Sequence, residues 1–279
     1  YLLSEVHLIL SFHRWGELVL SDQRFDSVYF DKYRRKSSIL RLPYGDKLFY
    51  YSFWSRFLRK HLPPNAVVLE VGCGLGFFLK RLETTFRTFG IDVSRAALQE
   101  ARSITRLSHL LYGSAESIPF SNEFFHAVVA FDVIEHLVKP EIFFMEAFRV
   151  LREGGLLCIT TPNLNSLGAL LNPRKRNLGN QYGRLDILQS YIWRDETQIN
   201  LREPREWTTC LERIGFQILR KGTDSLWDLP YTDKIPYLIQ KTFLVPFNIF
   251  LTSIFGFLPW SYGENFVCVA RKLKGGSTR

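Results

Sequence analysis

The sequence predicts an α/β protein whose parallel sheet is doubly wound, with helices covering both faces. Two observations carry this prediction. From about residue 66 onward, short apolar runs alternate with segments whose apolar residues recur at helical spacing. A glycine-rich turn, "GCGLG", stands between the first apolar run and the first of these helical segments. Strands that alternate with helices are joined by right-handed crossovers, which makes neighbouring strands parallel.

A helical region is expected before the sheet, over residues 1–62. Within it, residues 46–62 ("DKLFYYSFWSRFLRKHL") have an apolar face at helical spacing, and Pro63 and Pro64 end this helix. The chain starts with "YLLSEVHLIL", which has no basic leader and no small-residue cleavage site. We therefore predict no signal peptide.

The elements of the sheet domain, residues 63–279, follow in order. Strands are predicted over residues 66–71, 87–93, 107–113, 124–133, 156–162, 216–222 and 265–272. Helices are predicted over residues 77–85, 94–103, 139–155 and 203–215. Ser94 is a suitable N-cap for the second of these helices, and Gly154 and Gly215 stand where the last two should end. Two long excursions, 163–203 and 223–263, interrupt the alternation, and connections of this length usually carry function.

Composition limits the kinds of partner. The chain is 15% aromatic, with 24 phenylalanines, which indicates a large core or an apolar binding surface. Its net charge of +9 favours anionic lipid, phosphorylated substrates or nucleic acid, although a solvated basic surface explains it equally well. The four cysteines are dispersed and form no C-x-x-C pair, which is typical of reduced cysteines in a cytoplasmic protein.

The glycine turn predicts a site for a nucleoside-containing cofactor. Glycines let the backbone turn tightly and let a ligand approach the N–H groups at a helix start. Asp92 ends the next strand, where a carboxylate accepts hydrogen bonds from both ribose hydroxyls. The spacing is G-x-G-x-G rather than the dinucleotide G-x-G-x-x-G. Glu70 beside the turn repels a pyrophosphate and suits an ammonium group, which disfavours a nicotinamide cofactor.

Four stretches in this order resemble the class I S-adenosylmethionine-dependent methyltransferases. They are "LEVGCGLG", "GIDVS", "GSAESIPFSNEFFHAVVAFDVIEHL" and "FRVLREGGLLCITTPN". The resemblance is strong from Val67 to Asn163 and weaker over 204–222 and the last strand. It implies a Rossmann-like seven-stranded sheet with a reversed last strand, and S-adenosylmethionine as the cofactor.

The resemblance also assigns the cofactor contacts. The loop of Gly72, Cys73, Gly74 and Gly76 faces the methionine part, and Glu70 organises its amino end. Asp92 holds the ribose and Val93 packs on the adenine, while Ser114, Ala115 and Glu116 lie at the adenine edge. Phe131 and Asp132 approach the methionine part and the transferred methyl group. The family often has Asp where this chain has Ser114, so a weaker contact with the adenine is expected there.

His136 and Glu135, in "DVIEHL", are the catalytic candidates. A general base is needed if the methyl acceptor is a hydroxyl or a protonated amine, and His136 follows the fourth strand at the mouth of the site. A structural His that bonds the loop is the alternative. Asp132, Glu135 and His136 have a D-x-x-E-H spacing that some metal-dependent relatives share, but no histidine follows His136 in the chain, so no metal is predicted.

In this fold the acceptor is usually covered by the N-terminal region and by insertions, here 163–203 and 223–263. Residues 243–260 ("FLVPFNIFLTSIFGFLPW") carry no charge, and either a helical lid or an interfacial membrane segment explains them better than a membrane span does. The basic stretches 32–36 and 173–176 suit anionic headgroups, or are plain solvated faces.

The sequence therefore predicts a methyltransferase that acts on oxygen of a small-molecule, glycan or lipid-linked acceptor, in the cytoplasm or at the inner face of the membrane. A non-catalytic scaffold that binds the cofactor and an RNA methyltransferase are the alternatives. Basic and aromatic residues interleave as in single-strand binders, but no RNA-binding module is recognisable.

Overall fold

The structure is a computed structural model that describes residues 25, 27–34, 48–166, 182–184, 190–192, 197–223, 236–239, 242–243, 245–263 and 265–273. The predictions for residues 1–24, for the basic stretch 173–176 and for much of the two excursions lie outside these residues.

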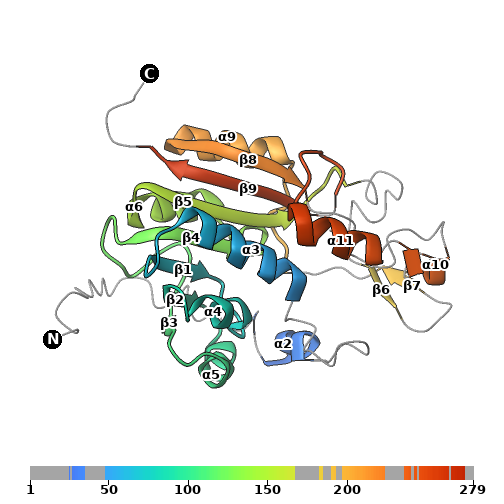
Figure 1. Cartoon of the computed structure of the whole chain (residues 1–279), viewed down its shortest axis with the longest axis horizontal. Coiled ribbons are helices and arrows are strands. Elements are labelled where there is room, and N and C mark those ends of the chain that lie inside the picture. The colour runs from blue at the N-terminus through green and yellow to red at the C-terminus, as the bar shows by residue number, and fades with distance from the viewer. Residues whose placement is uncertain are drawn as a thin grey trace.

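A seven-stranded sheet forms the centre of the molecule (Figure 1). Its strands, from one edge to the other, are β3 (His109–Tyr112), β2 (Arg87–Asp92), β1 (Val67–Val71), β4 (Phe125–Phe131), β5 (Leu151–Pro162), β9 (Asn265–Lys272) and β8 (Phe216–Thr223). The first five strands are parallel, and β9 runs antiparallel to both β5 and β8. The doubly wound sheet with a reversed last strand is therefore confirmed.

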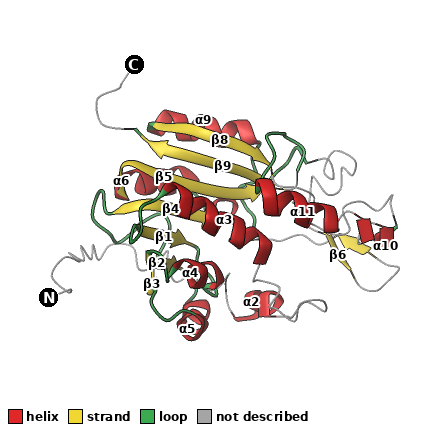
Figure 2. Cartoon of the chain, in the orientation of Figure 1, coloured by secondary structure: helices red, strands yellow, loops and turns green. Residues whose placement is uncertain are grey.

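Helices cover both faces of this sheet (Figure 2). They are α2 (Ser27–Arg34), α3 (Leu48–His61), α4 (Phe77–Leu82), α5 (Arg95–Ile104), the 3₁₀ turn η1 (Ile134–His136), α6 (Pro140–Val150), α9 (Pro204–Ile214), α10 (Tyr237–Ile239) and α11 (Val245–Phe255). In Figure 1, α3, α4 and α11 lie over the near face and α6 and α9 over the far face. A small hairpin of β6 (Tyr182–Arg184) and β7 (Ser190–Ile192) stands apart from the sheet.

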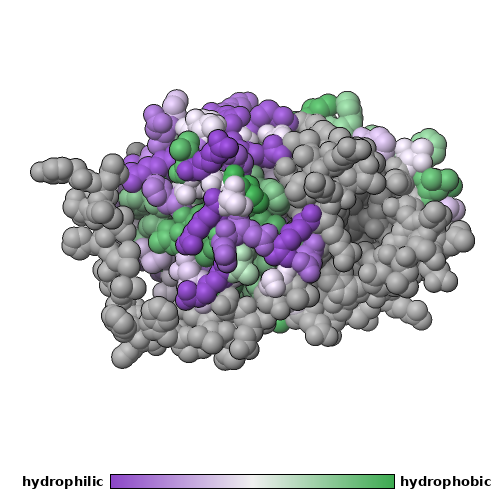
Figure 3. All heavy atoms as spheres, turned by 90° about the horizontal axis from the view of Figure 1, so that it is seen from below, coloured by the Kyte–Doolittle hydropathy of each residue, from purple (hydrophilic) through white to green (hydrophobic). Residues whose placement is uncertain are grey.

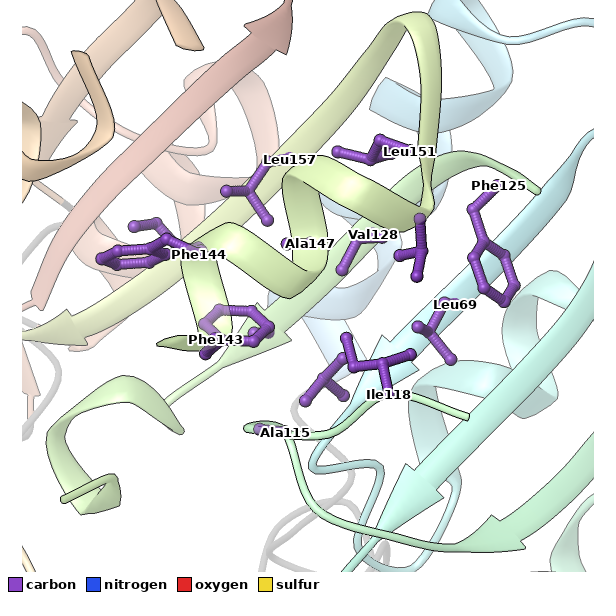
Figure 4. Packing of buried hydrophobic residues seen from close by; sticks show 14 of the residues in the cluster. Leu69, Ala115, Ile118, Phe125, Val128, Phe143, Phe144, Ala147, Leu151 and Leu157 are labelled. Atoms are coloured by element: carbon purple, nitrogen blue, oxygen red, sulfur yellow. The ribbon is translucent and has the colours of Figure 1, made fainter. Parts of the chain in front are cut away.

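The two faces of the sheet carry separate apolar cores. Phe143 and Phe144 of α6 pack on one face against Val128 of β4 (Figure 4). Trp54 of α3 packs on the other face with Val129, the next residue along the same strand. Successive side chains of a strand point to opposite faces, so a strand buried on both sides reads as a continuous apolar run. Each such side chain stabilises the fold by about 1.5–3 kcal/mol.

The predicted helix ends are confirmed at two places and wrong at one. The Ser94 hydroxyl accepts a hydrogen bond from the Ala97 N–H at 3.2 Å, and Gly215 ends α9 with a φ of 111°. Helix α6, however, ends at Val150, before the predicted Gly154. Leu151 already pairs with Phe125, and an irregularity then shifts the register to Ala127–Leu156, so Gly154 lies inside β5 with a φ of 74°.

Helix α11 occupies most of the charge-free stretch 243–260. Helix α11 ends at Gly256, whose φ is 70° and where an added Cβ would lie 2.1 Å from the Phe53 ring. The helix thus packs closely on α3 at this point. Within the part of the chain that the structure describes, no helix has the length and apolar character needed to cross a membrane.

Candidate functional site

The carboxyl ends of β1, β2 and β4 meet where the direction of winding changes. The chain proceeds from β1 to β2 and β3 on one side, and β4 and β5 lie on the other side of β1. Loops that leave adjacent strands in opposite directions open a crevice, which is the usual ligand site of such sheets. Most of the residues predicted to bind the cofactor lie at the carboxyl ends of these three strands or shortly after them.

The glycine loop follows β1, and neighbouring residues leave no space for a side chain at its first glycine. Gly72 has a φ of 68°, and a Cβ added there would lie 2.4 Å from Cγ2 of Val133. No larger residue fits without moving the loop that follows β4. The N–H groups of Gly72 and Cys73 both donate to the Ile91 carbonyl, at 2.8 and 3.1 Å, and bind the loop to β2.

Asp92 holds the same loop with its carboxylate. One carboxylate oxygen, Oδ2, accepts from the Gly74 N–H at 2.7 Å, and Oδ1 accepts from the Ser94 N–H at 2.8 Å. The side chain is buried, and β2 positions it at the end of the strand. Asp92 therefore organises the loop as well as offering the acceptor predicted for ribose hydroxyls, since a carboxylate has about four lone-pair sites.

Glu70 is the most unusual group of the site. Its side chain is buried in β1, and within the described part of the chain Oε2 has no hydrogen-bond partner. Burial, and then the nearby Asp92 carboxylate, raise the pKa of Glu70 well above its usual range, while a hydrogen bond from the backbone of Leu79 lowers it. Such an orphaned buried oxygen suits a ligand that brings an ammonium group.

The remaining predicted contacts lie around this centre in different settings. Cys73 is buried beside Leu79 and Leu98, and burial raises the pKa of its thiol well above the usual value, so it is a packing residue rather than a nucleophile. Val93 is half-buried directly after β2. Gly76 begins α4 with a φ of 77°.

The stretch after β3 turns back beside Asp92. The Gly113 N–H donates to the Asp92 carbonyl at 3.1 Å, which brings the following residues to the same edge. The Ser114 hydroxyl accepts from the Glu116 N–H at 3.1 Å, and Ala115 is buried in the core. The Glu116 carboxylate accepts from the Lys139 N–H at 2.8 Å and so joins this turn to the start of α6.

Strand β4 ends with the apolar residue Phe131, and the polar residue Asp132 follows it. Phe131 stacks edge-on or tilted against the rings of Tyr50, Trp54 and Phe78, whose centroids lie 5.2–5.7 Å away. Asp132 has a φ of 56° and accepts a hydrogen bond from the Thr160 hydroxyl at 2.9 Å. Left-handed backbone at a non-glycine residue is uncommon and is often found at functional sites.

The two catalytic candidates lie side by side in η1, with unequal access. Glu135 is fully buried, its Oε2 accepts from the Thr161 hydroxyl at 3.0 Å, and its Oε1 lies 3.8 Å from Nε2 of His136. His136 retains a small exposed fraction, and its ring meets Phe25 edge-on with centroids 5.4 Å apart. Of these two residues only His136 keeps an exposed fraction, and its Nε2 faces the Glu135 carboxylate.

Sequence reasoning missed two contributors to the site. Helix α2 lies against the glycine loop, since a Cβ added at Gly74 would lie 3.3 Å from the Phe30 ring. Asn200 donates through Nδ2 to the Leu137 carbonyl at 2.7 Å, and its N–H donates to the Glu135 carbonyl at 2.8 Å. The end of the first excursion thereby fixes η1. Both contacts join residues far apart in sequence, and no local pattern signals them.

Among the residues that the structure describes, no group of three or more His, Cys, Asp and Glu side chains could hold a metal ion. The residues present do fit S-adenosylmethionine. Glu70 offers an unsatisfied buried acceptor, Asp92 has spare acceptor capacity, and the Gly72 turn leaves space for the backbone alone.

A seven-stranded sheet with a reversed last strand and this crevice at its switch point defines the class I methyltransferase architecture. Residues 69–159 match the family described as "Methyltransferase domain". Residues 69–159 thus match a methyltransferase domain, and the predicted resemblance to the class I methyltransferases and the predicted cofactor, S-adenosylmethionine, are confirmed.

Relatives and solved structures agree with this assignment. Over 97 residues the chain is 35% identical to a Mycolicibacterium smegmatis protein named "Probable S-adenosylmethionine-dependent methyltransferase", covering 34% of this chain and 38% of that one. Over 101 residues it is 35% identical to 2-methyl-6-phytyl-1,4-hydroquinone methyltransferase 2 of rice, Oryza sativa, covering 34% and 29%. The matched part therefore spans about a third of the length of these relatives.

The crystal structure of magnesium protoporphyrin IX methyltransferase from Synechocystis, which contains bound S-adenosylhomocysteine, superposes with a TM-score of 0.58. The match covers 91% of this chain and 99% of that one at 14% sequence identity. At this identity the likeness shows that the fold is shared.

Proposed function

We propose that the protein is an S-adenosylmethionine-dependent methyltransferase that methylates oxygen of a small-molecule, glycan or lipid-linked acceptor. The observation that carries the proposal is the Glu70 carboxyl, which is buried at the end of β1 beside the glycine loop with an unpartnered oxygen. S-adenosylmethionine supplies an activated methyl group on a sulfonium. Its ammonium group would be the partner for the Glu70 carboxyl.

The chain's own residues supply binding and positioning. Asp92 takes the ribose hydroxyls while it holds Gly74, and Phe131 closes one side with an aromatic wall. Positioning and water exclusion account for much of the acceleration of a displacement of this kind. A scaffold that never turned over would not need this arrangement together with a histidine at the mouth.

His136 takes the proton of an acceptor hydroxyl in this proposal. The Glu135 carboxyl 3.8 Å from Nε2 favours the imidazolium that results, and the contacts of Thr161 and Asn200 hold the pair in place. An oxygen acceptor is favoured because a base at this position is useful when a hydroxyl has to be deprotonated. The name of the rice relative describes a hydroquinone with a phytyl chain, which agrees with an apolar acceptor carrying hydroxyls.

Calorimetry with S-adenosylhomocysteine tests the cofactor half of the proposal. Micromolar binding is expected, and Asp92→Ala should lower the affinity by about tenfold or more, because it removes the ribose acceptor and frees Gly74. Glu153→Ala, an exposed carboxylate in the irregular part of β5, is the matched control and should bind normally. If the unaltered protein does not bind S-adenosylhomocysteine, the proposal is wrong.

A screen of lipid, glycan and small-molecule acceptors with methyl-labelled S-adenosylmethionine tests the catalytic half. With the acceptor that takes label, His136→Ala should lower turnover by about a hundredfold or more while the affinity for S-adenosylhomocysteine holds. His109→Ala, in β3, is the control. Cofactor binding with no labelled acceptor would favour the scaffold, and label in RNA would favour the RNA methyltransferase.

A further inference from the structure

Helix α11, together with Phe243 just before it, exposes a stripe of large apolar side chains. Phe243, Phe247, Phe250 and Ile254 follow each other at spacings of four, three and four residues, which places them on one side of a helix. Their exposed fractions are 67%, 55%, 59% and 54%. Soluble surfaces carry such residues singly, so an aligned set marks an interaction surface. We call these four residues the α11 stripe.

More apolar groups continue this surface on both sides. Leu238 and Ile239 of α10 are exposed before the helix, and Trp260 and Tyr262 are exposed after it. Hydrophobic residues appear at the right-hand end of Figure 3, where Figure 1 places α10 and α11. No charged residue occurs from Phe243 to Gly263. A solvated helix would carry charges on its outer face.

Helix α3, which packs beside α11, carries basic residues and no acidic residue. Helices α3 and α11 pack together on the near face of the sheet (Figure 1). Neither helix contains Asp or Glu, and α3 exposes Arg56, Arg59 and Lys60. Arg220 of β8 is also exposed, with its guanidinium 4.6 Å from the centre of the Phe257 ring, just beyond the end of α11. Within α3 and α11 the charged side chains are therefore all basic.

We propose that this face docks on a lipid bilayer that carries anionic headgroups. The α11 stripe enters the boundary between headgroups and acyl chains, and Arg56 and Lys60 contact the anionic headgroups. Binding of an interfacial helix grows with buried apolar area and with attraction to anionic lipid. An exposed Trp and Tyr beside the stripe suit the interfacial depth, where aromatic side chains with a polar group gather. Helix α11, with 11 residues, is too short to span the bilayer, so it lies on it.

A second copy of the chain is the other occupant to consider. Two copies that met through α3 and α11 would bring Arg59 and Lys60 of each copy together, and neither helix carries an acidic residue. Like charges at an interface oppose association. An anionic bilayer satisfies both the apolar stripe and the charge, so the bilayer is the occupant that the residues favour.

Docking on a bilayer would explain how the enzyme reaches a lipid-linked acceptor. Only this link to the acceptor rests on the proposed function. The segment that follows α11 lies at the carboxyl end of β5, because Asn163 just after that strand donates through Nδ2 to the Ser261 and Gly263 carbonyls at 2.9 and 2.8 Å. An enzyme held at the bilayer by α11 meets an acceptor carried by a lipid without extracting it into water.

Sedimentation of the full chain with vesicles tests the proposal. The chain should sediment with phosphatidylcholine–phosphatidylglycerol vesicles and much less with phosphatidylcholine alone, and added salt should weaken binding. Phe247→Glu combined with Phe250→Glu should lower the partition coefficient by about tenfold or more. Arg56→Gln combined with Lys60→Gln should lower it roughly tenfold.

Met145→Glu is the matched control, because Met145 is 60% exposed but lies on α6 across the sheet. It should sediment like the unaltered chain. Equal sedimentation of the Phe247→Glu, Phe250→Glu chain would overturn the proposal. So would a dimer in solution that these two substitutions dissociate, because the face would then join two copies.

Calorimetry with S-adenosylhomocysteine on the same variants separates this proposal from the proposed function. The Phe247→Glu, Phe250→Glu chain should keep the affinity of the unaltered chain, which also shows that it is folded. If the unaltered chain did not bind S-adenosylhomocysteine, the proposed function would be contradicted. The vesicle experiment would still show whether the chain docks on a bilayer.

Discussion

Glu70 places a carboxyl group inside the core at the carboxyl end of β1, where burial and Asp92 both oppose its ionisation. An isolated buried charge is costly, so the group without a ligand favours its protonated form. A bound ammonium group reverses this balance because it stabilises the carboxylate. The binding of the cofactor and the loss of a proton from Glu70 are therefore coupled.

Cofactor binding should release a proton from Glu70. The pKa of Glu70 is raised in the free protein and lowered by the bound ammonium, so between these two values the free protein carries a proton that the complex lacks. The affinity for S-adenosylhomocysteine should rise with pH across that window and level off above it. Calorimetry in buffers with different heats of ionisation measures the released proton directly.

Glu70→Gln is the control for this coupling. It keeps the shape of the side chain but cannot release a proton. The heat of binding should therefore no longer vary with the buffer, and the affinity should fall by about tenfold or more. A heat of binding that is independent of the buffer in the unaltered protein, together with an affinity independent of pH, would show that Glu70 does not meet an ammonium group.

At the scale of single elements, α2 is the part that closes the site from outside the sheet. Phe30 packs in a small cluster with Leu75 of the glycine loop and Ala97 of α5. Arg34, at the other end of α2, donates through Nε to the Glu100 carboxylate at 2.9 Å. The helix has little contact with the main cores, so its place depends on these few contacts.

Loosening α2 should weaken cofactor binding without unfolding the domain. Phe30→Ala removes the ring that covers Gly74, and we expect a roughly fivefold to tenfold loss of affinity for S-adenosylhomocysteine by calorimetry, because a closed helix excludes water from the site. The melting temperature without ligand should change little, since α2 is peripheral. Unchanged affinity in a folded Phe30→Ala chain would show that α2 does not cover the cofactor.

Arg34→Ala is the companion variant. It should shift the affinity in the same direction but less, because the ion pair with Glu100 is partly exposed and such pairs are weak.

The elements differ in how far the sequence could predict them. Buried strands such as β1 and β4 are short apolar runs beside turn residues, so the alternation predicts them directly. The predicted end of α6 was wrong because the "LREGG" stretch resembles the last turn of a helix. In the structure Leu151 pairs with Phe125, so this stretch belongs to β5. The position of α2 was not predictable, because it depends on Phe30 meeting residues more than forty positions away.

At the scale of the whole molecule, the sheet connects every part of the site. Asp92 ends β2, the glycine loop follows β1 and His136 follows β4, and these three strands are adjacent. The sequence predicted this meeting point because glycines and acids follow successive parallel strands. It did not predict that Asp92 would hold Gly74 and Ser94, nor that Asn200 would fix η1, because these hydrogen bonds depend on how distant loops meet.

A ligand bound at this junction should therefore stabilise the sheet domain as one unit. S-adenosylhomocysteine at a hundred times its dissociation constant should add about 2.7 kcal/mol to the free energy of unfolding, which corresponds to a rise of roughly 5–10 °C in melting temperature for a domain of this size. Differential scanning calorimetry should show one transition that moves as a whole, because β1, β2 and β4 carry both the site and the core. At the same ligand concentration Asp92→Ala should remove about half of the shift or more, and Glu153→Ala should leave it intact. Two transitions, of which the ligand moves only the smaller, would mean that the cofactor loops and the sheet unfold separately.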